Sequence, residues 1–256
     1  MAETVTLSME SRGVVGITIA RPERKNAFDA SLIAELTAAI GRVDRAARAV
    51  VLQSEGDVFC AGADIEWMRG MAGYSLDENL ADSKALAEMF RALYDLEMPL
   101  LVRVQGAAIG GGAGLVAVAD IAVASTEATF AFTETRLGIL PAVVSPYVVR
   151  KIGPARATAL FVTGAKIDAR RAHEIGLVER LVEPSDLDAA VARVVDAVTA
   201  GGPKAVNAAK HLVREVEDRP VADVADLVVK RIAEIRVSRE GQEGLRAFLE
   251  RREPRW

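Results

Sequence analysis

Two short segments of small residues each follow an apolar stretch that is typical of a buried strand. The first turn covers 59–65 (FCAGADI) after residues 49–53, and the second turn covers 106–114 (GAAIGGGAG) after residues 100–104. Small residues let a ligand approach the backbone, and N–H groups at the start of a helix are unpaired and carry partial positive charge. Two such turns side by side would direct two N–H groups at one oxygen, as in an oxyanion hole for an enolate or a tetrahedral intermediate.

Spacing alone also fits two tight strand-to-helix connections, and by itself it favours that simpler interpretation. The three glycines from Gly110 to Gly112 match neither the dinucleotide-binding pattern G-x-G-x-x-G nor the P-loop, because no Gly-Lys-Ser/Thr follows them. A phosphate-binding loop is therefore a weaker hypothesis than an oxyanion hole.

Glu134 is the candidate acid or base. It lies between the apolar stretches FAFT and TRLGIL, after a short predicted strand and before a Gly/Pro turn. Apolar surroundings disfavour the ionised carboxyl and raise its pKa toward the range that is useful for proton transfer. A surface glutamate paired with Arg136 fits the same pattern, and these residues alone do not separate the two hypotheses.

The remaining inventory excludes several kinds of chemistry. The 256-residue chain has one cysteine and two histidines, so a disulfide framework is impossible and we predict no metal site. His173 and His211 lie in predicted helices without a nucleophile or acid partner, and Cys60 is expected to pack as a small apolar residue. The net charge of −4 argues against a nucleic-acid partner, and 51% hydrophobic residues exclude a disordered chain.

Strands and helices alternate in the first part of the chain, which predicts an α/β fold. Period and residue type predict a helix that begins near Asp29 and another at 78–96. Strands are expected at 14–20, 49–53, 100–104, 120–124 and 129–132. After about Pro154 the pattern is helical, with one strand at 178–182. These helices are expected at 154–163, 168–176, 185–200, 203–217, 221–236 and 240–252.

Nothing in the sequence indicates a membrane or secretory protein. The N-terminus lacks a basic stretch followed by an apolar one, and the longest apolar run, 107–119, is too short to cross a bilayer. A lone cysteine fits a reducing compartment. We therefore expect a cytoplasmic protein with no membrane partner.

Several motifs in order resemble the crotonase (enoyl-CoA hydratase/isomerase) superfamily over nearly the whole chain. They are 21–28 (RPERKNAF), the two turns, 130–141 and 243–252 (EGLRAFLERR). The resemblance implies a spiral of ββα units in residues 1–195 that holds the catalytic site. It also implies a helical region, 196–256, that packs a homotrimer or a dimer of trimers and covers the site. The implied substrate is an acyl-CoA thioester, with no separate cofactor.

The resemblance also assigns roles to single residues. The N–H groups of Ala63 and Gly111 would form the oxyanion hole around the thioester oxygen. The first of two glutamates common in such hydratases falls on Gly114, which cannot transfer a proton, and the second falls on Glu134. A water-binding N–H falls on Ala142. The residues implied to contact CoA are Arg24, Lys25, Ala61, Ala63, Asp64 and Ile65, although the two basic ones fit solvated charges equally well.

The expected substrate pocket is formed by Trp67, Gly114, Ala142, Ser145 and Tyr147. For Trp67, Ser145 and Tyr147, packing or capping of a helix is the alternative role. Arg136 is a candidate for recognising a substrate carboxylate, and an ion pair with a neighbouring acid is its simpler role.

The run 134–148 (ETRLGILPAVVSPYV) resembles the bacterial methylglutaconyl-CoA hydratase-like branch, which serves leucine and acyclic-terpene breakdown. The resemblance implies hydration of the α,β double bond of an enoyl-CoA, with a branched or carboxyl-bearing acyl group such as 3-methylglutaconyl. A Δ3,Δ2-enoyl-CoA isomerase is the alternative, because one carboxylate can move a proton from Cα to Cγ. A non-catalytic acyl-CoA binder on the same fold is a third hypothesis.

Overall fold

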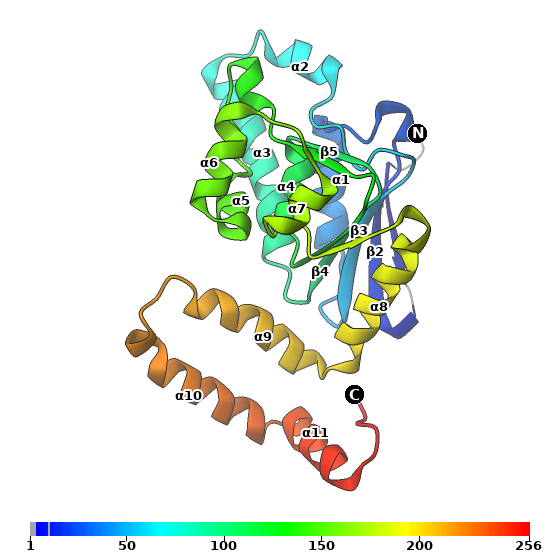
Figure 1. Cartoon of the computed structure of the whole chain (residues 1–256), viewed down its shortest axis with the longest axis vertical. Coiled ribbons are helices and arrows are strands. Elements are labelled where there is room, and N and C mark those ends of the chain that lie inside the picture. The colour runs from blue at the N-terminus through cyan, green and yellow to red at the C-terminus, as the bar shows by residue number, and fades with distance from the viewer. Residues whose placement is uncertain (1–3, 10) are drawn as a thin grey trace.

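A six-stranded sheet forms the centre of the protein in a computed structural model that describes residues 4–9 and 11–256 (Figure 1). Its strand order is β1-β2-β3-β4-β6-β9, and β1 alone runs antiparallel to its neighbour. The strands are β1 (Val5–Met9), β2 (Val14–Ile19), β3 (Ala49–Ser54), β4 (Leu100–Val104), β6 (Ile121–Ser125) and β9 (Arg180–Val182).

The central strands read as continuous apolar runs because helices cover both faces of the sheet. On β3, Val50 and Leu52 belong to the larger core, which α1 (Ala30–Gly41) and α3 (Leu76–Tyr94) cover. Val51, between them, faces the opposite side and packs with residues of α8 (Leu187–Ala200). The period of two along the strand thus divides the core into two layers.

A second, smaller sheet carries the elements that lead into the candidate site. Its order is β5-β7-β8, formed by Ala107–Ile109, Thr129–Ala131 and Ile167–Asp168. β5 pairs in parallel with β7, so the second turn and the segment that begins at Glu134 leave the same edge of this sheet. The other helices before α8 are α2 (Ile65–Met71), α4 (Gly111–Val118), α5 (Ser145–Ile152), α6 (Pro154–Thr163) and α7 (Ala169–Glu174), and α2 lies at the opposite end of the molecule from the C-terminal helices (Figure 1).

Three C-terminal helices extend away from this core: α9 (Pro203–Val216), α10 (Val221–Val237) and α11 (Arg239–Glu250) (Figure 1). The boundary expected between residues 195 and 196 falls inside α8, which is continuous and packs on the main sheet. The change from core to extended helices therefore comes at the Gly201-Gly202 link before α9. The described part of the chain contains no helix long and apolar enough to cross a membrane.

The α/β fold expected from the sequence is confirmed, and most predicted elements lie within two or three residues of the observed ones. The side chain of Asp29 caps α1 by accepting a hydrogen bond from the N–H of Leu32, as its position suggested. The apolar run 107–119 divides into β5 and α4, which the sequence did not separate. β1 and β8 were not predicted: β1 is a largely exposed edge strand and β8 has two residues, so neither shows a strand period.

Gly106, between β4 and β5, lies close to the backbone of Asp57. A Cβ atom at Gly106 would lie 1.9 Å from the carbonyl oxygen of Asp57, so no side chain fits without backbone movement. We expect Gly106→Ala to lower the free energy of unfolding by at least about 2 kcal/mol, measured by urea denaturation. Gly41→Ala is the control, because nothing lies within 4 Å of a Cβ there, and it should leave stability unchanged or higher. Equal effects of the two substitutions would contradict this description.

Candidate active site

The two turns lie in direct backbone contact. The N–H of Cys60 donates to the carbonyl of Ala107 at 3.0 Å, and the N–H of Ile109 donates to the carbonyl of Cys60 at 2.9 Å. Gly62 has φ +93°, and a Cβ there would lie 3.2 Å from the carbonyl oxygen of Ile109. Glycine is therefore needed at this position both for its backbone angle and for the close approach.

Two residues at the starts of helices line one cavity at this contact. They are Ala63, just before the Asp64 cap of α2, and Gly111, the first residue of α4. Within the part of the chain that the structure describes, neither N–H donates to a backbone carbonyl. The cavity has a volume of about 300 Å³, and such an arrangement can hold an oxygen atom that gains negative charge.

The Glu134 carboxylate lies in the same cavity, next to the second turn. A Cβ at Gly110 would be 3.1 Å from Glu134 Oε1, and Oε2 is buried without a hydrogen-bond partner among the described residues. Burial raises the pKa of Glu134 above its ordinary value of 4.5, against a smaller lowering by its own backbone N–H. A carboxyl group of this kind is suited to proton transfer.

Arg136 does not neutralise Glu134. No ion pair joins them in the described structure, and the Arg136 side chain packs beside Gly164, where a Cβ would lie 3.0 Å from its Nε. Arg136 is also not among the residues that line the cavity, because the short 3₁₀ helix Glu134–Leu137 turns it outward. The surface-pair interpretation of Glu134 is therefore wrong, and Arg136 is not placed to recognise a substrate carboxylate.

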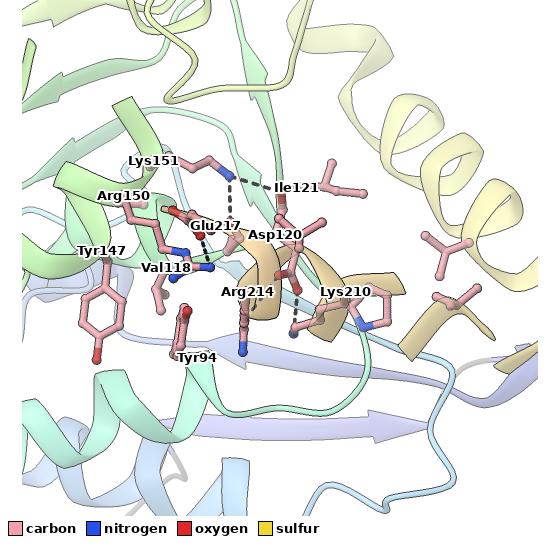
Figure 2. A pocket seen from close by; sticks show the side chains of 16 residues that line it. Tyr94, Val118, Asp120, Ile121, Tyr147, Arg150, Lys151, Lys210, Arg214 and Glu217 are labelled. Atoms are coloured by element: carbon pink, nitrogen blue, oxygen red, sulfur yellow. Dashed lines mark hydrogen bonds and ion pairs between the residues drawn. The ribbon is translucent and has the colours of Figure 1, made fainter. Parts of the chain in front are cut away.

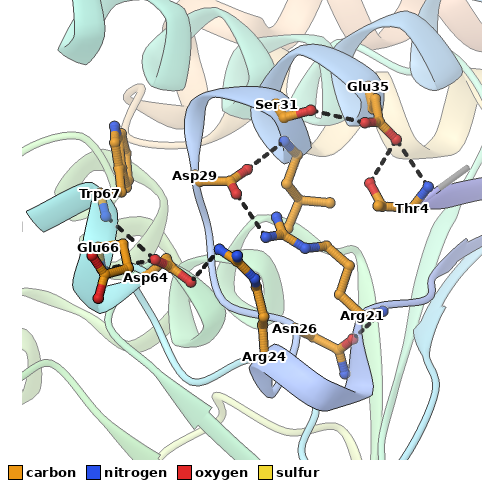
Figure 3. A network of polar contacts seen from close by, with 11 residues as sticks. Thr4, Arg21, Arg24, Asn26, Asp29, Ser31, Glu35, Asp64, Glu66 and Trp67 are labelled. Atoms are coloured by element: carbon orange, nitrogen blue, oxygen red, sulfur yellow. Dashed lines mark hydrogen bonds and ion pairs between the residues drawn. The ribbon is translucent and has the colours of Figure 1, made fainter. Parts of the chain in front are cut away.

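The stretch 21–28 lies beside the first turn (Figure 3). The N–H of Phe28 donates to Gly62 at 2.7 Å, and the N–H of Ala61 donates to Lys25 at 3.0 Å. The Arg24 guanidinium lies 3.3 Å from the Asp64 carboxylate, whose other oxygen accepts from the first N–H groups of α2. The residues expected to contact CoA are thus brought to one surface, and their binding to CoA stays a prediction.

Asn26 holds this stretch in place, and the sequence analysis missed it. Its side chain is fully buried, accepts from the N–H of Arg21, and donates to the carbonyls of Glu55 and Val58. Its φ of +54° is one that asparagine tolerates better than most residues. The Arg21 guanidinium binds Asp29 at 2.6 Å and ties the same stretch to α1 (Figure 3). A polar residue beside a turn, of a type that accepts positive φ, was the available signal.

The position expected for the first glutamate is filled by neighbouring side chains. A Cβ at Gly114 would lie 2.3 Å from Val144 Cγ1 and 3.0 Å from Phe90 Cζ. Both neighbours are buried, so the volume that a glutamate would occupy is apolar core. The absence of a carboxylate at position 114 therefore agrees with the surrounding packing, which leaves no space for a glutamate side chain.

The other predicted pocket residues are only partly brought together. Trp67 and Ala142 line the cavity, whereas Gly114 is buried behind it and Ser145 caps its own turn by donating to the carbonyl of Ala142. Tyr147 lines a different cavity with Tyr94, beside a network of charged residues (Figure 2). α5 directs it there, away from the two turns. The sequence analysis did not identify Phe28, Met71, Asp82, Leu86 and Val144, which also line the site cavity.

Other candidates are absent from the cavity. Burial raises the pKa of the Cys60 thiol to about 12, which makes it an inert packing residue. His173 contacts the carbonyl of Val178, and His211 of α9 lines a separate cavity formed with α10. Within residues 4–9 and 11–256, no three His, Cys, Asp or Glu side chains gather where they could hold a metal. No residue after Val144 lines the cavity, so within one described chain the C-terminal helices do not cover it.

Comparison with known proteins agrees with this geometry. Residues 9–256 match the family model described as enoyl-CoA hydratase/isomerase. A putative enoyl-CoA hydratase of Thermus thermophilus is 31% identical over 98% of this chain and 100% of that protein. A probable enoyl-CoA hydratase of Rhodobacter capsulatus is 35% identical, with 95% and 94% covered. The crystal structure of a putative enoyl-CoA hydratase/isomerase (crotonase) from Legionella pneumophila superposes with a TM-score of 0.95, at 38% identity and 99% coverage of both chains.

The chain therefore belongs to the enoyl-CoA hydratase/isomerase family and has the crotonase fold. It is an enzyme of that family, which is why the cavity between the two turns is taken as its active site.

Gly114 and Val144 provide a test of the packing around the site. We expect Gly114→Ala to lower the free energy of unfolding by about 1–3 kcal/mol, because the new methyl group overlaps Val144. The double variant Gly114→Ala/Val144→Ala should regain part of this loss, since the second change removes the overlapping atoms. Denaturant unfolding of the four proteins in the cycle measures the coupling. Additive effects would show that the two side chains do not compete for this space.

Proposed function

We propose that this enzyme is an enoyl-CoA hydratase that adds water across the α,β double bond of its substrate. One observation carries the proposal: the Glu134 carboxylate, whose buried Oε2 has no hydrogen-bond partner among the described residues, shares a cavity with Ala63 and Gly111. Two donors for an oxygen and one group for proton transfer are what addition to a conjugated thioester requires.

In the proposed mechanism, the thioester oxygen accepts hydrogen bonds from Ala63 and Gly111. Glu134 removes a proton from a water molecule, whose oxygen forms a bond to Cβ, and the π electrons move toward the thioester oxygen. The two N–H groups stabilise the resulting enolate, a contribution of about 3 kcal/mol for one such donor. Glu134, now protonated, returns the proton to Cα, so a single carboxyl group acts first as base and then as acid.

The cavity supports a branched, mainly apolar acyl group. Its walls include Phe28, Met68, Met71, Leu86 and Val143, and no Lys, Arg or His of the described chain lines it. A carboxyl-bearing acyl group such as 3-methylglutaconyl would meet the carboxylates of Glu134 and Asp82 without a cation. We therefore propose a branched enoyl-CoA without a terminal carboxyl group, which departs from the carboxyl-bearing acyl group implied by the resemblance to the leucine- and terpene-degrading branch. A cytoplasmic location is part of the same proposal, favoured by the single cysteine.

Isomerisation of a Δ3-enoyl-CoA is the second candidate. The packing at Gly114 favours it, because it leaves Glu134 alone to handle protons and a Cα-to-Cγ transfer needs only one carboxylate.

Substitution of Glu134 by Gln keeps the side-chain shape and removes the base. We expect kcat/KM for enoyl-CoA hydration to fall by about 10²–10⁴-fold, the usual contribution of a general base. Loss of enoyl absorbance reports hydration, and a gain of conjugated absorbance from a 3-enoyl-CoA reports isomerisation. Hydration by Glu134→Gln at the wild-type rate would refute the assignment.

The pH dependence is the control for this variant. The base must be ionised and its pKa is raised, so wild-type kcat/KM should fall as the pH decreases through a value above 4.5. Glu134→Gln should lose this acid limb while remaining folded by circular dichroism.

We also propose that α10 and α11 pack against neighbouring copies in a homotrimer or a dimer of trimers. Large apolar side chains are exposed along these helices: Val221, Val229, Val237, Leu245, Phe248 and Leu249. Exposed apolar surface of this extent is typical of a protein interface.

The double variant Phe248→Asp/Leu249→Asp should lower the molar mass measured by light scattering toward 27.3 kDa, because each change buries a charge at the proposed interface. Val162→Asp, at an exposed valine on α6, is the matched control and should keep the wild-type mass. A wild-type protein of monomer mass would refute the assembly.

A further inference from the structure

One face of α3 follows the active-site cavity over two turns of helix. Asp82 and Leu86 line the cavity, and Phe90, four residues further on, contacts the Gly114 position. Residues four apart share one side of a helix, so these three side chains form a continuous stripe.

The stripe shows how far Asp82 lies along α3 from the second turn. Phe90 lies level with Gly114, close to the second turn, and Asp82 precedes it by eight residues. At a rise of 1.5 Å per residue, Asp82 lies about 12 Å further along the helix axis. Asp82 is therefore at the remote end of the cavity, too far along α3 to replace the glutamate that is missing at 114.

The remote end is polar, unlike the walls that lead to it. Asp82 is half-buried, and no cation of the described chain forms an ion pair with it. Burial raises the pKa of Asp82, and the nearby indole N–H of Trp67 lowers it by a smaller amount. Trp67 Nε1 does not reach hydrogen-bond geometry with any described residue, so the carboxylate keeps its capacity to accept a hydrogen bond. Ser83, also a lining residue, adds a second polar group.

We propose that Asp82 selects acyl groups that carry a hydroxyl at the end remote from the thioester. This inference rests on the proposed function and names the substrate class of the same site. A hydroxyl donates a hydrogen bond to the carboxylate, and because it is neutral it costs less to desolvate beside the apolar walls than an ion does. An ammonium would have to lose its hydration among Met68, Met71 and Leu86, and a carboxylate would be repelled by both Asp82 and Glu134.

The separation of Phe90 and Asp82 along α3 sets the expected position of the hydroxyl. An extended chain advances by about 3.3–3.6 Å for every three bonds, so 12 Å corresponds to roughly ten bonds. The matching acyl groups therefore have about eight to ten carbons in the main chain.

The test compares 8-hydroxyoct-2-enoyl-CoA with oct-2-enoyl-CoA. For the wild type we expect the ratio of their kcat/KM values to favour the hydroxyl compound by about tenfold or more, as a hydrogen bond to a charged group allows. Asp82→Leu should reduce this ratio by about the same factor. Glu88→Gln removes an exposed acid from the same helix and should keep the wild-type ratio. An unchanged ratio in Asp82→Leu, or a wild-type preference for the terminal carboxyl of oct-2-enedioyl-CoA, would overturn the proposal.

Binding of saturated analogues separates this proposal from the proposed function. 8-Hydroxyoctanoyl-CoA and octanoyl-CoA cannot be hydrated, and calorimetry gives their Kd values for the wild type and Asp82→Leu. A hydroxyl preference that Asp82→Leu abolishes supports the role of Asp82 even if no enoyl-CoA is hydrated. Hydration without any hydroxyl preference would overturn the role of Asp82 and leave the hydratase proposal intact.

Discussion

The active site depends on the contact between two backbone turns that leaves no space for side chains. Gly62 faces Ile109, and a Cβ at Gly112 would lie 2.6 Å from the carbonyl oxygen of Cys60. This contact fixes the two turns relative to each other, because Cys60 also exchanges hydrogen bonds with both ends of β5. Two N–H groups on separate segments can point into one cavity only if their backbones are held in this way.

The helix that delivers one of these N–H groups is anchored at its other end as well. At the C-terminus of α4, Lys151 donates to the carbonyls of Ala119 and Asp120, and Lys210 of α9 binds the Asp120 carboxylate at 2.6 Å (Figure 2). Cations are favourable there because the helix dipole is negative at that end. Burial lowers the pKa of both lysines, and the Asp120 charge opposes this effect. The extended C-terminal helices are thus joined to the element that begins at Gly111.

The sequence predicted the parts of the fold that carry a long regular pattern. β3 and β4 are continuous apolar runs and were located within a residue, whereas β8 has two residues and no pattern to detect. The role of Glu134 could not be decided from its neighbours in the sequence, because the cavity that it lines is formed by several separate segments, among them 61–63, 109–111 and 139–144. Asp82 gave no signal at all, because it is one polar residue in a mostly exposed helix, and only the fold brings it to the cavity that Trp67 and Met68 of α2 also line.

The two carboxylates of the cavity lie far apart. The group proposed to transfer protons is therefore separate from the group proposed to select the acyl chain. Next to the turns, Val144 and Phe90 fill the space beside Gly114 and leave Glu134 as the single titratable group near the reacting carbons. In the proposed mechanism its proton is therefore exchanged only with water or substrate. A second carboxylate close by would raise the pKa of Glu134 further and add a charge to be neutralised. Placed about 12 Å from Phe90 along α3, Asp82 leaves that balance undisturbed and, as proposed, would meet only the far end of the acyl group.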